Sequence, residues 1–455
     1  MRTFDVVVIG AGPGGEVAAG RLAEAGLDVA IVEADKVGGE CSFYACMPSK
    51  ALLRPGELLA EARRTAGVSA AVTGDLDVAA VLRRRDELIG HLDDAGQVPW
   101  LTERGVTLVR GWGRLAGEKR VAVGDEILDA RRAVILAGGT RAARPAIDGL
   151  AEAKPWTNRQ AVTTPAVPES LIIIGGGVVG VEMSQAFTSL GARVTLIPGE
   201  RGLLPREERF AGEQVAASLA EQGVDIRAAG RATAVRRDPE AGVTVTLSDG
   251  TSVTGAEILV AAGREPQAAG LGLAGLGIDE TGYVKVDENM RVPGLDWLYV
   301  VGDLNGKALF THMAKYQAAI ASGDVLGRGM AAEHLGDGPG APRVIFTEPQ
   351  VAAVGHTTVT AAAAGLAVRV VDVPTDGNAG GAFTGGPRGT ARFLVDTDRD
   401  VLVGVTLTGA GVADFLQAAT IAVVGEVPIS RLRHAIPAFP TRSEIWLHLF
   451  DALGI

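Results

Sequence analysis

The fold is decided by the stretch FDVVVIGAGPGG at residues 4–15. Its β-branched start is typical of a buried parallel strand. Gly10, Gly12 and Gly15 then follow at the spacing G-x-G-x-x-G, and residues 16–25 have a helical pattern. Glycines at these places allow a tight turn, let a pyrophosphate approach the backbone and let the helix pack on the strand. The stretch therefore predicts a dinucleotide-binding unit.

The residues after this unit support the same prediction. A second strand at 28–32 ends in Glu33, whose carboxylate can accept hydrogen bonds from a ribose diol. A further buried strand at 133–137 ends at Gly138, where small residues let the backbone come close to a bound cofactor. We interpret these elements as parts of one nucleotide site.

The glycine pattern then occurs a second time. A strand at 170–174 leads into Gly175, Gly177 and Gly180, and a helix follows at 181–190. An internal repeat of the unit implies two dinucleotides. The simplest assignment is one flavin site and one nicotinamide site.

The second unit differs from the first at the end of its second strand. Pro198 stands where Glu33 stood, and Glu200 and Arg201 follow. An acid at this point favours NAD, whereas a nearby arginine accommodates the 2′-phosphate of NADP. Arg201, together with Arg206, favours NADPH slightly. Glu200 reaching the ribose, or arginines that are merely solvated, are equally open alternatives.

The two cysteines of the chain form a separate motif. Cys41 and Cys46 lie in GGECSFYACMPSK, residues 38–50. Two thiols at this spacing can bridge only where the backbone bends or a helix is just beginning, and Met47-Pro48 favours such a bend. A pair of unrelated buried thiols is the alternative.

Composition limits the kind of partner. The 455 residues carry a net charge of −11 without a lysine- and arginine-rich block, which argues against nucleic acid. No apolar run approaches the ~20 residues of a membrane span, and the first 14 residues look like a strand and turn rather than a signal peptide. We expect a cytoplasmic protein that binds no membrane and no metal. The histidines are dispersed, at His91, His312, His334, His356, His434 and His448.

Several other segments complete the expected architecture. We expect helices at 51–67, interrupted by Pro55, and at 78–92, and short antiparallel strands at 106–109, 120–123 and 126–129.

Two later strands end in Gly263-Arg264 and in Gly302-Asp303, and an aspartate at a strand end faces the crevice where α/β proteins bind ligands. A glycine- and proline-rich linker at 336–342 precedes a last domain without a glycine fingerprint.

With these motifs in this order, the chain resembles the flavoprotein disulfide reductases, the family of dihydrolipoamide dehydrogenase, glutathione reductase and mercuric reductase. The resemblance covers essentially the whole chain. It implies an α/β fold of two Rossmann-like domains and a C-terminal α+β dimerisation domain, a homodimer, and FAD and NAD(P)H as cofactors. The expected segments are 1–150 and 269–338 for FAD, 151–268 for NAD(P), and 339–455 for the subunit interface.

The resemblance also implies roles for individual residues. Cys41 and Cys46 match the active-site disulfide, with Cys46 nearest the flavin and Cys41 as the exchanger that attacks an outside disulfide. Lys50 and Glu182 match an ion pair beside the flavin N5, and Asp303 is expected on the ribityl chain. The expected cofactor-binding residues are Gly10, Gly12, Gly15, Glu33, Gly39, Gly138, Gly302 and Asp303, with Gly175, Gly177, Gly180, Arg201, Gly263 and Arg264.

One departure from the family changes the expected chemistry. The family signature His-Pro-Thr-x-x-Glu contains the general acid/base of the exchange thiol, and here residues 439–444 read FPTRSE. Phe439 cannot carry a proton, so ordinary dithiol–disulfide turnover should be poor. Glu444 is retained, and His434 or Tyr44 are the alternative proton carriers. Mercuric activity is also doubtful, because the tyrosine and extra cysteines of those enzymes are missing.

Phe43, Tyr44 and Phe439 either line an apolar substrate pocket or serve as packing residues. Three functions remain open: a reductase that passes electrons through the cysteines to a small disulfide or thiol acceptor, a flavin-direct quinone reductase, transhydrogenase or oxidase, and a docking subunit without catalysis. The intact cysteines and fingerprints argue against the third.

Overall fold

The computed structural model describes residues 1–333 and 335–455, so His334 lies outside the described residues. The chain forms two compact units and passes between them five times: inside helices α3 (Cys46–Arg64) and α4 (Val78–Leu88), after Ala143, after Gly263 and after Gly338. The four-segment domain division expected from the sequence stays a prediction. The first unit comprises 1–48, 86–143 and 264–338, and the second comprises 49–85, 144–263 and 339–455.

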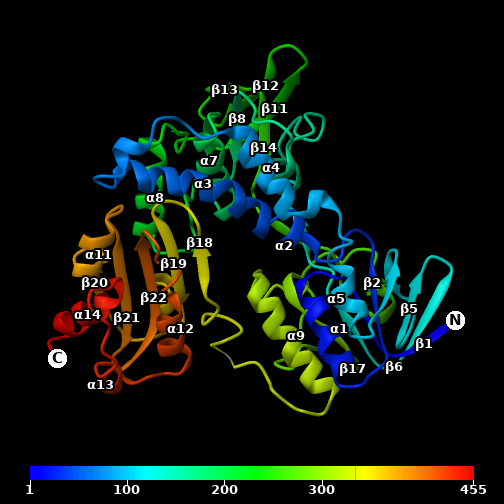
Figure 1. Ribbon diagram of the computed structural model, residues 1–455. Helices are drawn as coiled ribbons and strands as arrows, with labels where there is room; N and C mark the ends of the chain where they lie inside the picture. Colours follow the sequence, from blue (N-terminus) through cyan, green and yellow to red (C-terminus); the bar gives the residue numbers. More distant parts are fainter. Residues whose placement is uncertain (334) are drawn as a thin grey trace. The chain divides into compact units, whose positions relative to one another are not determined.

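The first unit is built on an eight-stranded sheet with the path β16-β17-β6-β1-β2-β3, extended by β5 and β4 beside β6 (Figure 1). Its strands are β1 (Arg2–Ile9), β2 (Val29–Glu33), β3 (Thr107–Arg110), β4 (Gly113–Leu115), β5 (Arg120–Val123), β6 (Glu126–Leu136), β16 (Arg291–Val292) and β17 (Leu295–Val300), and β7 (Thr140–Ala142) pairs separately with β15 (Arg264–Pro266). Its helices are α1 (Pro13–Glu24), α2 (Gly39–Phe43), α5 (Val98–Thr102) and α9 (Thr311–Val325), with 3-10 helices η2 (Gly90–Leu92), η3 (Ala274–Leu276) and η4 (Gly302–Asn305).

Strand β1 is the centre of this sheet. It pairs in parallel with β2 and with β6, and Val6, Val7 and Val8 are fully buried. Helices α1 and α9 lie side by side and contribute apolar residues to the same core (Figure 1). Burial on both faces explains why β1 reads as a continuous apolar run.

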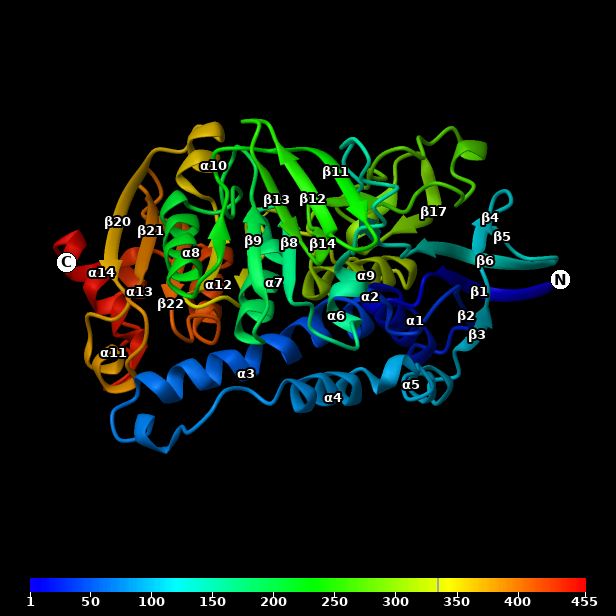
Figure 2. The same cartoon turned by 90° about the horizontal axis from the view of Figure 1, so that it is seen from above.

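The second unit repeats this arrangement. Its parallel sheet has the order β10-β9-β8-β14, with β8 (Ser170–Ile174) in the place of β1 and α7 (Val178–Ser189) following it (Figure 2). The predicted internal repeat is therefore present as strand, glycine turn and helix. The other elements of this part are β9 (Arg193–Ile197), β10 (Asp225–Ile226), β14 (Glu257–Val260), the antiparallel β11 (Ala232–Asp238), β12 (Gly242–Leu247) and β13 (Ser252–Gly255), and helices η1 (Ser69–Ala71), α6 (Asn158–Thr163) and α8 (Arg209–Glu221).

The C-terminal part of the second unit is an antiparallel sheet of order β18-β19-β22-β21-β20 with helices packed on it, as predicted for an α+β domain (Figure 2). The central strand β22 is buried along its whole length. The elements are β18 (Arg343–Ile345), β19 (Gln350–Gly355), β20 (Val368–Pro374), β21 (Thr390–Asp396), β22 (Val401–Gly409), α10 (Thr358–Ala363), α11 (Ala379–Thr384), α12 (Leu416–Val424), α13 (Ile429–Leu432), η5 (Arg442–Glu444) and α14 (Ile445–Leu453).

Helix α3 corrects two local expectations. It runs through Pro55 without interruption, because Leu52 and Leu53 are buried in the core of the second unit. Two buried leucines contribute about 3–6 kcal/mol, which offsets the ~3 kcal/mol that an interior proline costs. The helix also includes Met47 despite the following Pro48, since the N–H groups of the first turn have no partner within the helix.

One strand direction and two further boundaries differ from the sequence prediction. The strand expected at 106–109 is β3, and it is parallel to its neighbour β2 rather than antiparallel. The segments at 126–129 and 133–137 are one strand, β6, which pairs with β5 at its start and with β1 along most of its length. The helix expected at 78–92 ends at Leu88, because Gly90 and His91 have positive φ values of 55° and 52°.

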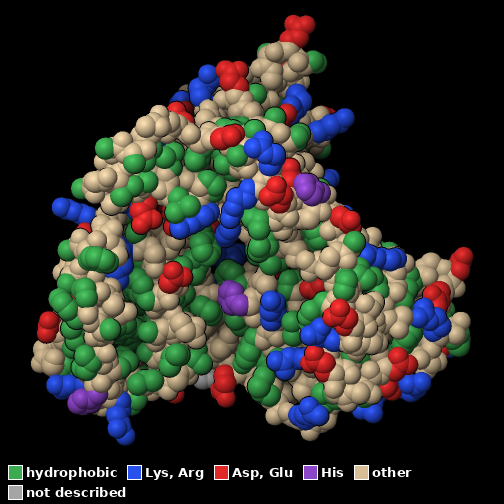
Figure 3. Space-filling model, viewed as in Figure 1, with side chains coloured by type: hydrophobic (Ala, Val, Ile, Leu, Met, Phe, Trp, Pro, Cys, Tyr) green, Lys and Arg blue, Asp and Glu red, His purple; other side chains and the backbone are tan. Residues whose placement is uncertain are grey.

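The molecular surface mixes charges of both signs. On the face seen in Figure 3, the described lysine and arginine side chains lie interspersed with aspartate and glutamate. Among residues 1–333 and 335–455, no helix is long and apolar enough to span a bilayer, and no three metal-binding side chains cluster together.

Candidate active site

Both cysteines belong to the first unit. Cys41 is on α2 and Cys46 begins α3, and the chain between them leaves the helical conformation at Tyr44, whose φ is −134°. The sulfurs are not joined by a disulfide in this structure. Cys46 Sγ lies 3.5 Å from Thr311 Oγ1 at the start of α9. The bend predicted between the cysteines is present.

The cysteine segment is attached to the first glycine turn. The Gly38 N–H donates to the Ala11 carbonyl at 2.8 Å. Gly39 has a φ of +58°, and a Cβ at this position would lie 2.9 Å from Gly12 Cα. Glycine is therefore required at position 39 by backbone conformation and by space, which places the predicted residue Gly39 at the turn.

The Cys41 thiol has a higher pKa than an ordinary cysteine. A hydrogen bond with the Cys46 sulfur raises the pKa of the Cys41 thiol, and burial raises it further, while Thr311 and Lys315 act in the opposite direction. A raised pKa favours the protonated thiol, which is the less reactive form of a cysteine.

The first glycine turn has the form that a bound pyrophosphate needs. A Cβ on Gly15 would lie 1.8 Å from the Gly10 carbonyl oxygen, so α1 packs directly on the end of β1. A Cβ on Gly12 would meet nothing within 4 Å, and no side chain caps α1 there. Glu33 holds the turn, since its Oε2 accepts from the Ala11 N–H at 2.7 Å. This open cradle fits the FAD site predicted from the sequence.

A second part of the predicted flavin site lies in the same unit. Asp303, on η4, accepts a hydrogen bond of 2.7 Å from Thr140 Oγ1, and burial raises the pKa of its carboxyl group. Arg264 Nε donates to Thr140 Oγ1 at 2.6 Å, and its Nη2 lies 3.4 Å from Glu40 Oε2. Pairing of β7 with β15 brings Thr140 and Arg264 together, although they are far apart in the sequence. Gly138 lies in the same region, and its carbonyl accepts a hydrogen bond from Gln267 Nε2.

The second glycine fingerprint, which lies in the second unit, has the same geometry. A Cβ on Gly180 would lie 1.9 Å from the Gly175 carbonyl oxygen, whereas one on Gly177 would meet nothing within 4 Å. Arg201 and Arg206 are both exposed. Gly263 and Arg264 were expected to bind the same cofactor. Gly263 belongs to the second unit, whereas Arg264 belongs to the first.

Lys50 and Glu182 form the expected ion pair. Lys50 Nζ lies 2.8 Å from Glu182 Oε2, and the ammonium is 4.8 Å from the centre of the Phe346 ring. Glu182 is 2% exposed, and its other oxygen accepts from the Phe346 N–H at 3.0 Å. A buried carboxylate with both oxygens engaged is held in one orientation.

The C-terminal signature at residues 439–444 does not have the arrangement of a base beside an acid that orients it. Phe439 is 77% exposed, and Glu444 Oε2 accepts from the Gly380 N–H of α11 at 3.2 Å. His434 is exposed on the turn after α13. Phe43 is 2% exposed and belongs to the protein interior, which supports the packing interpretation of this residue, and Tyr44 beside it is partly exposed.

Comparison with known proteins decides the family. The family model described as pyridine nucleotide-disulphide oxidoreductase matches residues 4–323. The chain belongs to this family. The family's dimerisation domain matches residues 341–449, and the family uses FAD and NAD(P)H, so the chain is an oxidoreductase.

Similar proteins span the whole chain. A dihydrolipoyl dehydrogenase of Thermus scotoductus is 31% identical, with 100% of this chain and 98% of that protein covered, and dihydrolipoyl dehydrogenase 3 of Pseudomonas aeruginosa is 32% identical, with 98% and 96% covered. Among solved structures, LpdA of Mycobacterium tuberculosis has a TM-score of 0.85 at 26% identity, covering 99% of both chains. The HOCl-induced flavoprotein disulfide reductase RclA of Escherichia coli has a TM-score of 0.86 at 24% identity, covering 98% and 99%, which shows the shared fold.

Sequence reasoning missed three residues at these sites. Thr311 contacts Cys46, and Thr140 donates a hydrogen bond to Asp303. The third is Glu16, in the first turn of α1, where burial raises the pKa to about 7. Glu16 follows the third glycine of the fingerprint directly, so an acid at that place was a visible signal. The threonines carry no pattern of their own.

Proposed function

We propose that the chain is an NAD(P)H-dependent flavoprotein reductase in which Cys41 and Cys46 relay electrons to a disulfide or thiol-type acceptor. The observation that carries this proposal is that the segment with both cysteines is attached to the open first glycine turn, through the Gly38 N–H on the Ala11 carbonyl and the close approach of Gly39 to Gly12. Unrelated buried thiols would have no reason to lie at a cofactor cradle.

FAD, when bound, carries two electrons from the nicotinamide to the disulfide. The chain's own residues hold the reacting groups and move protons. Reduction of the Cys41–Cys46 bridge breaks one S–S bond, and two electrons and two protons produce two thiols. Thr311 donates or accepts a hydrogen bond at Cys46, and the Lys50–Glu182 pair supplies a fixed charge of each sign for the nicotinamide step.

The acceptor step distinguishes this chain from a typical disulfide reductase. The raised pKa of Cys41 makes proton removal necessary before it attacks an outside disulfide. Phe439 cannot remove that proton, and Glu444 is engaged with the Gly380 N–H. We therefore propose that the physiological acceptor is not an ordinary dithiol–disulfide couple such as lipoamide.

A second candidate function is flavin-direct reduction of a quinone or similar non-disulfide acceptor, or transhydrogenation. The exposed Phe439 in place of a base favours it, because an apolar side chain suits an aromatic acceptor better than a thiolate.

For the nicotinamide we propose a modest preference for NADPH carried by Arg201. Arg201→Ala should weaken NADPH binding about tenfold or more and NADH binding little, because only NADPH has a 2′-phosphate. Arg209→Ala, another exposed arginine of this unit, serves as the control. Equal losses for both nucleotides would assign Arg201 a structural role.

Anaerobic titration tests the main proposal. Wild-type holoenzyme should take up about four electrons per flavin and Cys41→Ser about two, since a disulfide is a two-electron couple. Equal uptake by both proteins would show that the cysteines exchange no electrons with the flavin and would leave the flavin-direct function.

A further inference from the structure

Behind the Asp303 turn lies a buried polar network that the reaction does not use. Gln317, on α9, is fully buried, and its Oε1 accepts two hydrogen bonds of 2.8 Å. One comes from the Gly302 N–H and the other from Asn305 Nδ2. These residues are the two ends of η4, so a single amide oxygen holds the whole turn.

The orientation of the Gln317 amide is itself fixed. Its Nε2 donates to Asp337 Oδ1 at 2.7 Å, and Asp337 is 7% exposed. An ionised carboxylate only accepts hydrogen bonds, so the amide must present its nitrogen to Asp337 and its oxygen to the turn. Asp337 therefore decides which end of Gln317 meets Gly302.

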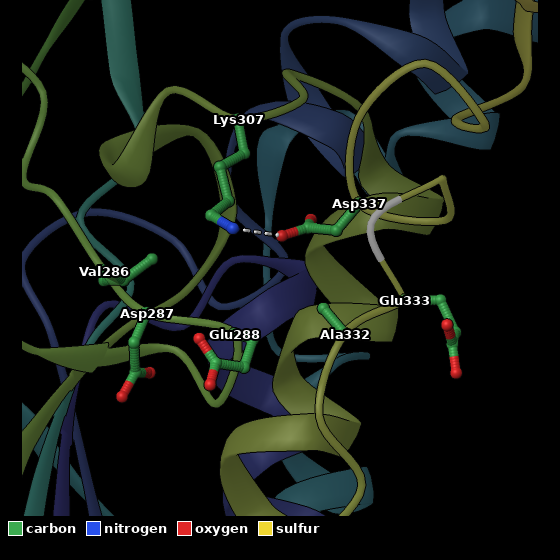
Figure 4. A pocket seen from close by; sticks show the side chains of 7 residues that line it. All are labelled: Val286, Asp287, Glu288, Lys307, Ala332, Glu333 and Asp337. Carbon is green, nitrogen blue, oxygen red and sulfur yellow. Dashed lines mark ion pairs between the residues drawn. The ribbon is translucent and has the colours of Figure 1, made fainter.

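Lys307 closes the network into a ring. Its Nζ lies 2.8 Å from Asp337 Oδ2 as an ion pair without the alignment of a hydrogen bond, and the two side chains point toward each other at the wall of a pocket (Figure 4). The Lys307 N–H donates to Asn305 Oδ1 at 3.1 Å. The ring therefore runs from η4 through Gln317, Asp337 and Lys307 back to η4.

The carboxylate of Asp303 is carried by the turn that this ring holds. Gly302 and Gly306, on either side of it, have positive φ values of 73° and 74°. Glycine can adopt many other backbone conformations, so the groups that hold η4 decide which one the turn takes. We propose that Gln317 and Asp337 are positioning residues for FAD, which place the Asp303 carboxylate by fixing the conformation of η4. This inference rests on the proposed flavoprotein function.

The remaining acids of the pocket provide a matched control. Glu333 also lines it, is exposed and is directed away from Lys307 (Figure 4). Glu333→Gln removes one negative charge from the same pocket, as Asp337→Asn does, without breaking the ring.

The experiment measures the dissociation constant of FAD from apoprotein by fluorescence quenching, with the melting temperature of each apoprotein beside it. In Asp337→Asn the Gln317 amide is no longer held in one orientation and can present its nitrogen to Gly302. In Gln317→Glu the new carboxylate faces the carboxylate of Asp337. Each should weaken FAD binding about tenfold or more. The double variant Gln317→Glu/Asp337→Asn exchanges the acid and the amide, restores a donor for each acceptor, and should recover most of the affinity. Glu333→Gln should bind FAD as the wild type does.

The outcomes separate the two proposals. Wild-type apoprotein that binds no FAD would refute the flavoprotein function. Wild-type protein that binds FAD while both single variants bind it equally well would refute the positioning role. Single variants that lose FAD together with a large fall in melting temperature, without recovery in the double variant, would also refute it, because the ring would then support the fold in general.

Discussion

At the scale of single residues, Phe439 has the greatest influence on the expected chemistry. It stands where the family has a histidine, and Glu444, the acid that follows it in the signature, bonds a backbone N–H of α11. The residue that would orient a base is therefore occupied in holding a helix.

We expect Phe439→His to raise NAD(P)H-dependent turnover with lipoamide by about tenfold or more, because an imidazole can take the proton of Cys41 before it attacks the outside disulfide. Reduction of the flavin by NAD(P)H should be unchanged, which stopped-flow absorbance can follow. Phe383→His is the control, since Phe383 is also exposed, at 80%. Wild-type protein that already turns over lipoamide as fast as its flavin is reduced would contradict the argument.

Glu16 gives a prediction on pH. Burial, assisted by the charge of Glu33, raises the pKa of Glu16 to about 7, and Lys315 opposes the shift. The folded protein therefore binds this proton more tightly than the unfolded chain. Stability from this group is complete below the ordinary pKa of 4.5 and is lost as the pH rises through about 7.

Glu16→Gln should therefore leave the melting temperature of the apoprotein unchanged near pH 5 and raise it by about 2–4 °C at pH 8. Scanning calorimetry across this range checks the result. Glu24→Gln changes an exposed acid at the other end of α1 and should show no such trend. A constant difference between wild type and Glu16→Gln at all pH values would rule out titration as the cause.

At the scale of elements, the second and third glycines of each glycine turn have different roles. The third glycine of each fingerprint touches backbone, whereas the second faces open space. The third is thus needed for packing of the helix on the strand, and the second for access of a ligand to the backbone.

We expect Gly15→Ala to destabilise the first unit by ~3 kcal/mol or more, because its Cβ would lie 1.8 Å from the Gly10 oxygen. Gly12→Ala should keep the melting temperature of the apoprotein and lower FAD affinity about tenfold or more, since its methyl group would occupy the cradle. Chemical denaturation and FAD titration separate the two effects. Gly177→Ala, the same change in the second fingerprint, is the control. It should leave FAD affinity unchanged and lower the affinity for NAD(P)H.

At the scale of the whole molecule, the C-terminal part of the second unit exposes large apolar side chains. Monomeric proteins rarely expose many of these together, and the family model for this part is a dimerisation domain. The exposed residues include Val359, Phe383, Ile421, Ile436 and Phe439.

We expect a homodimer of twice the 46.7 kDa chain mass in light scattering, and expect Ile421→Asp on α12 to shift it toward monomer. A charge introduced at a buried interface costs several kcal/mol when it has no partner. Val68→Asp, an exposed apolar position outside this part, should leave the mass unchanged. A wild-type monomer would refute the dimer, and an unchanged Ile421→Asp dimer would remove α12 from its interface.

The sequence by itself determined both nucleotide-binding units, their order and the cysteine motif. These features depend on local requirements: a tight turn needs glycine at fixed spacing, and a buried parallel strand needs a β-branched run. Spacing along the chain was sufficient because the interacting groups lie within about 25 residues of one another. Where propensity competed with packing, as at Pro55 of α3, local reasoning failed.

Only the tertiary structure decided which distant side chains meet. Arg264 joins Thr140 through the pairing of β15 with β7, and Gln317 meets Asp337 behind the Asp303 turn. Glu444 holds Gly380 in place of orienting a base. Single polar residues carry no periodicity, so their partners follow from the packing of whole elements and from the need of each buried polar group for a hydrogen bond.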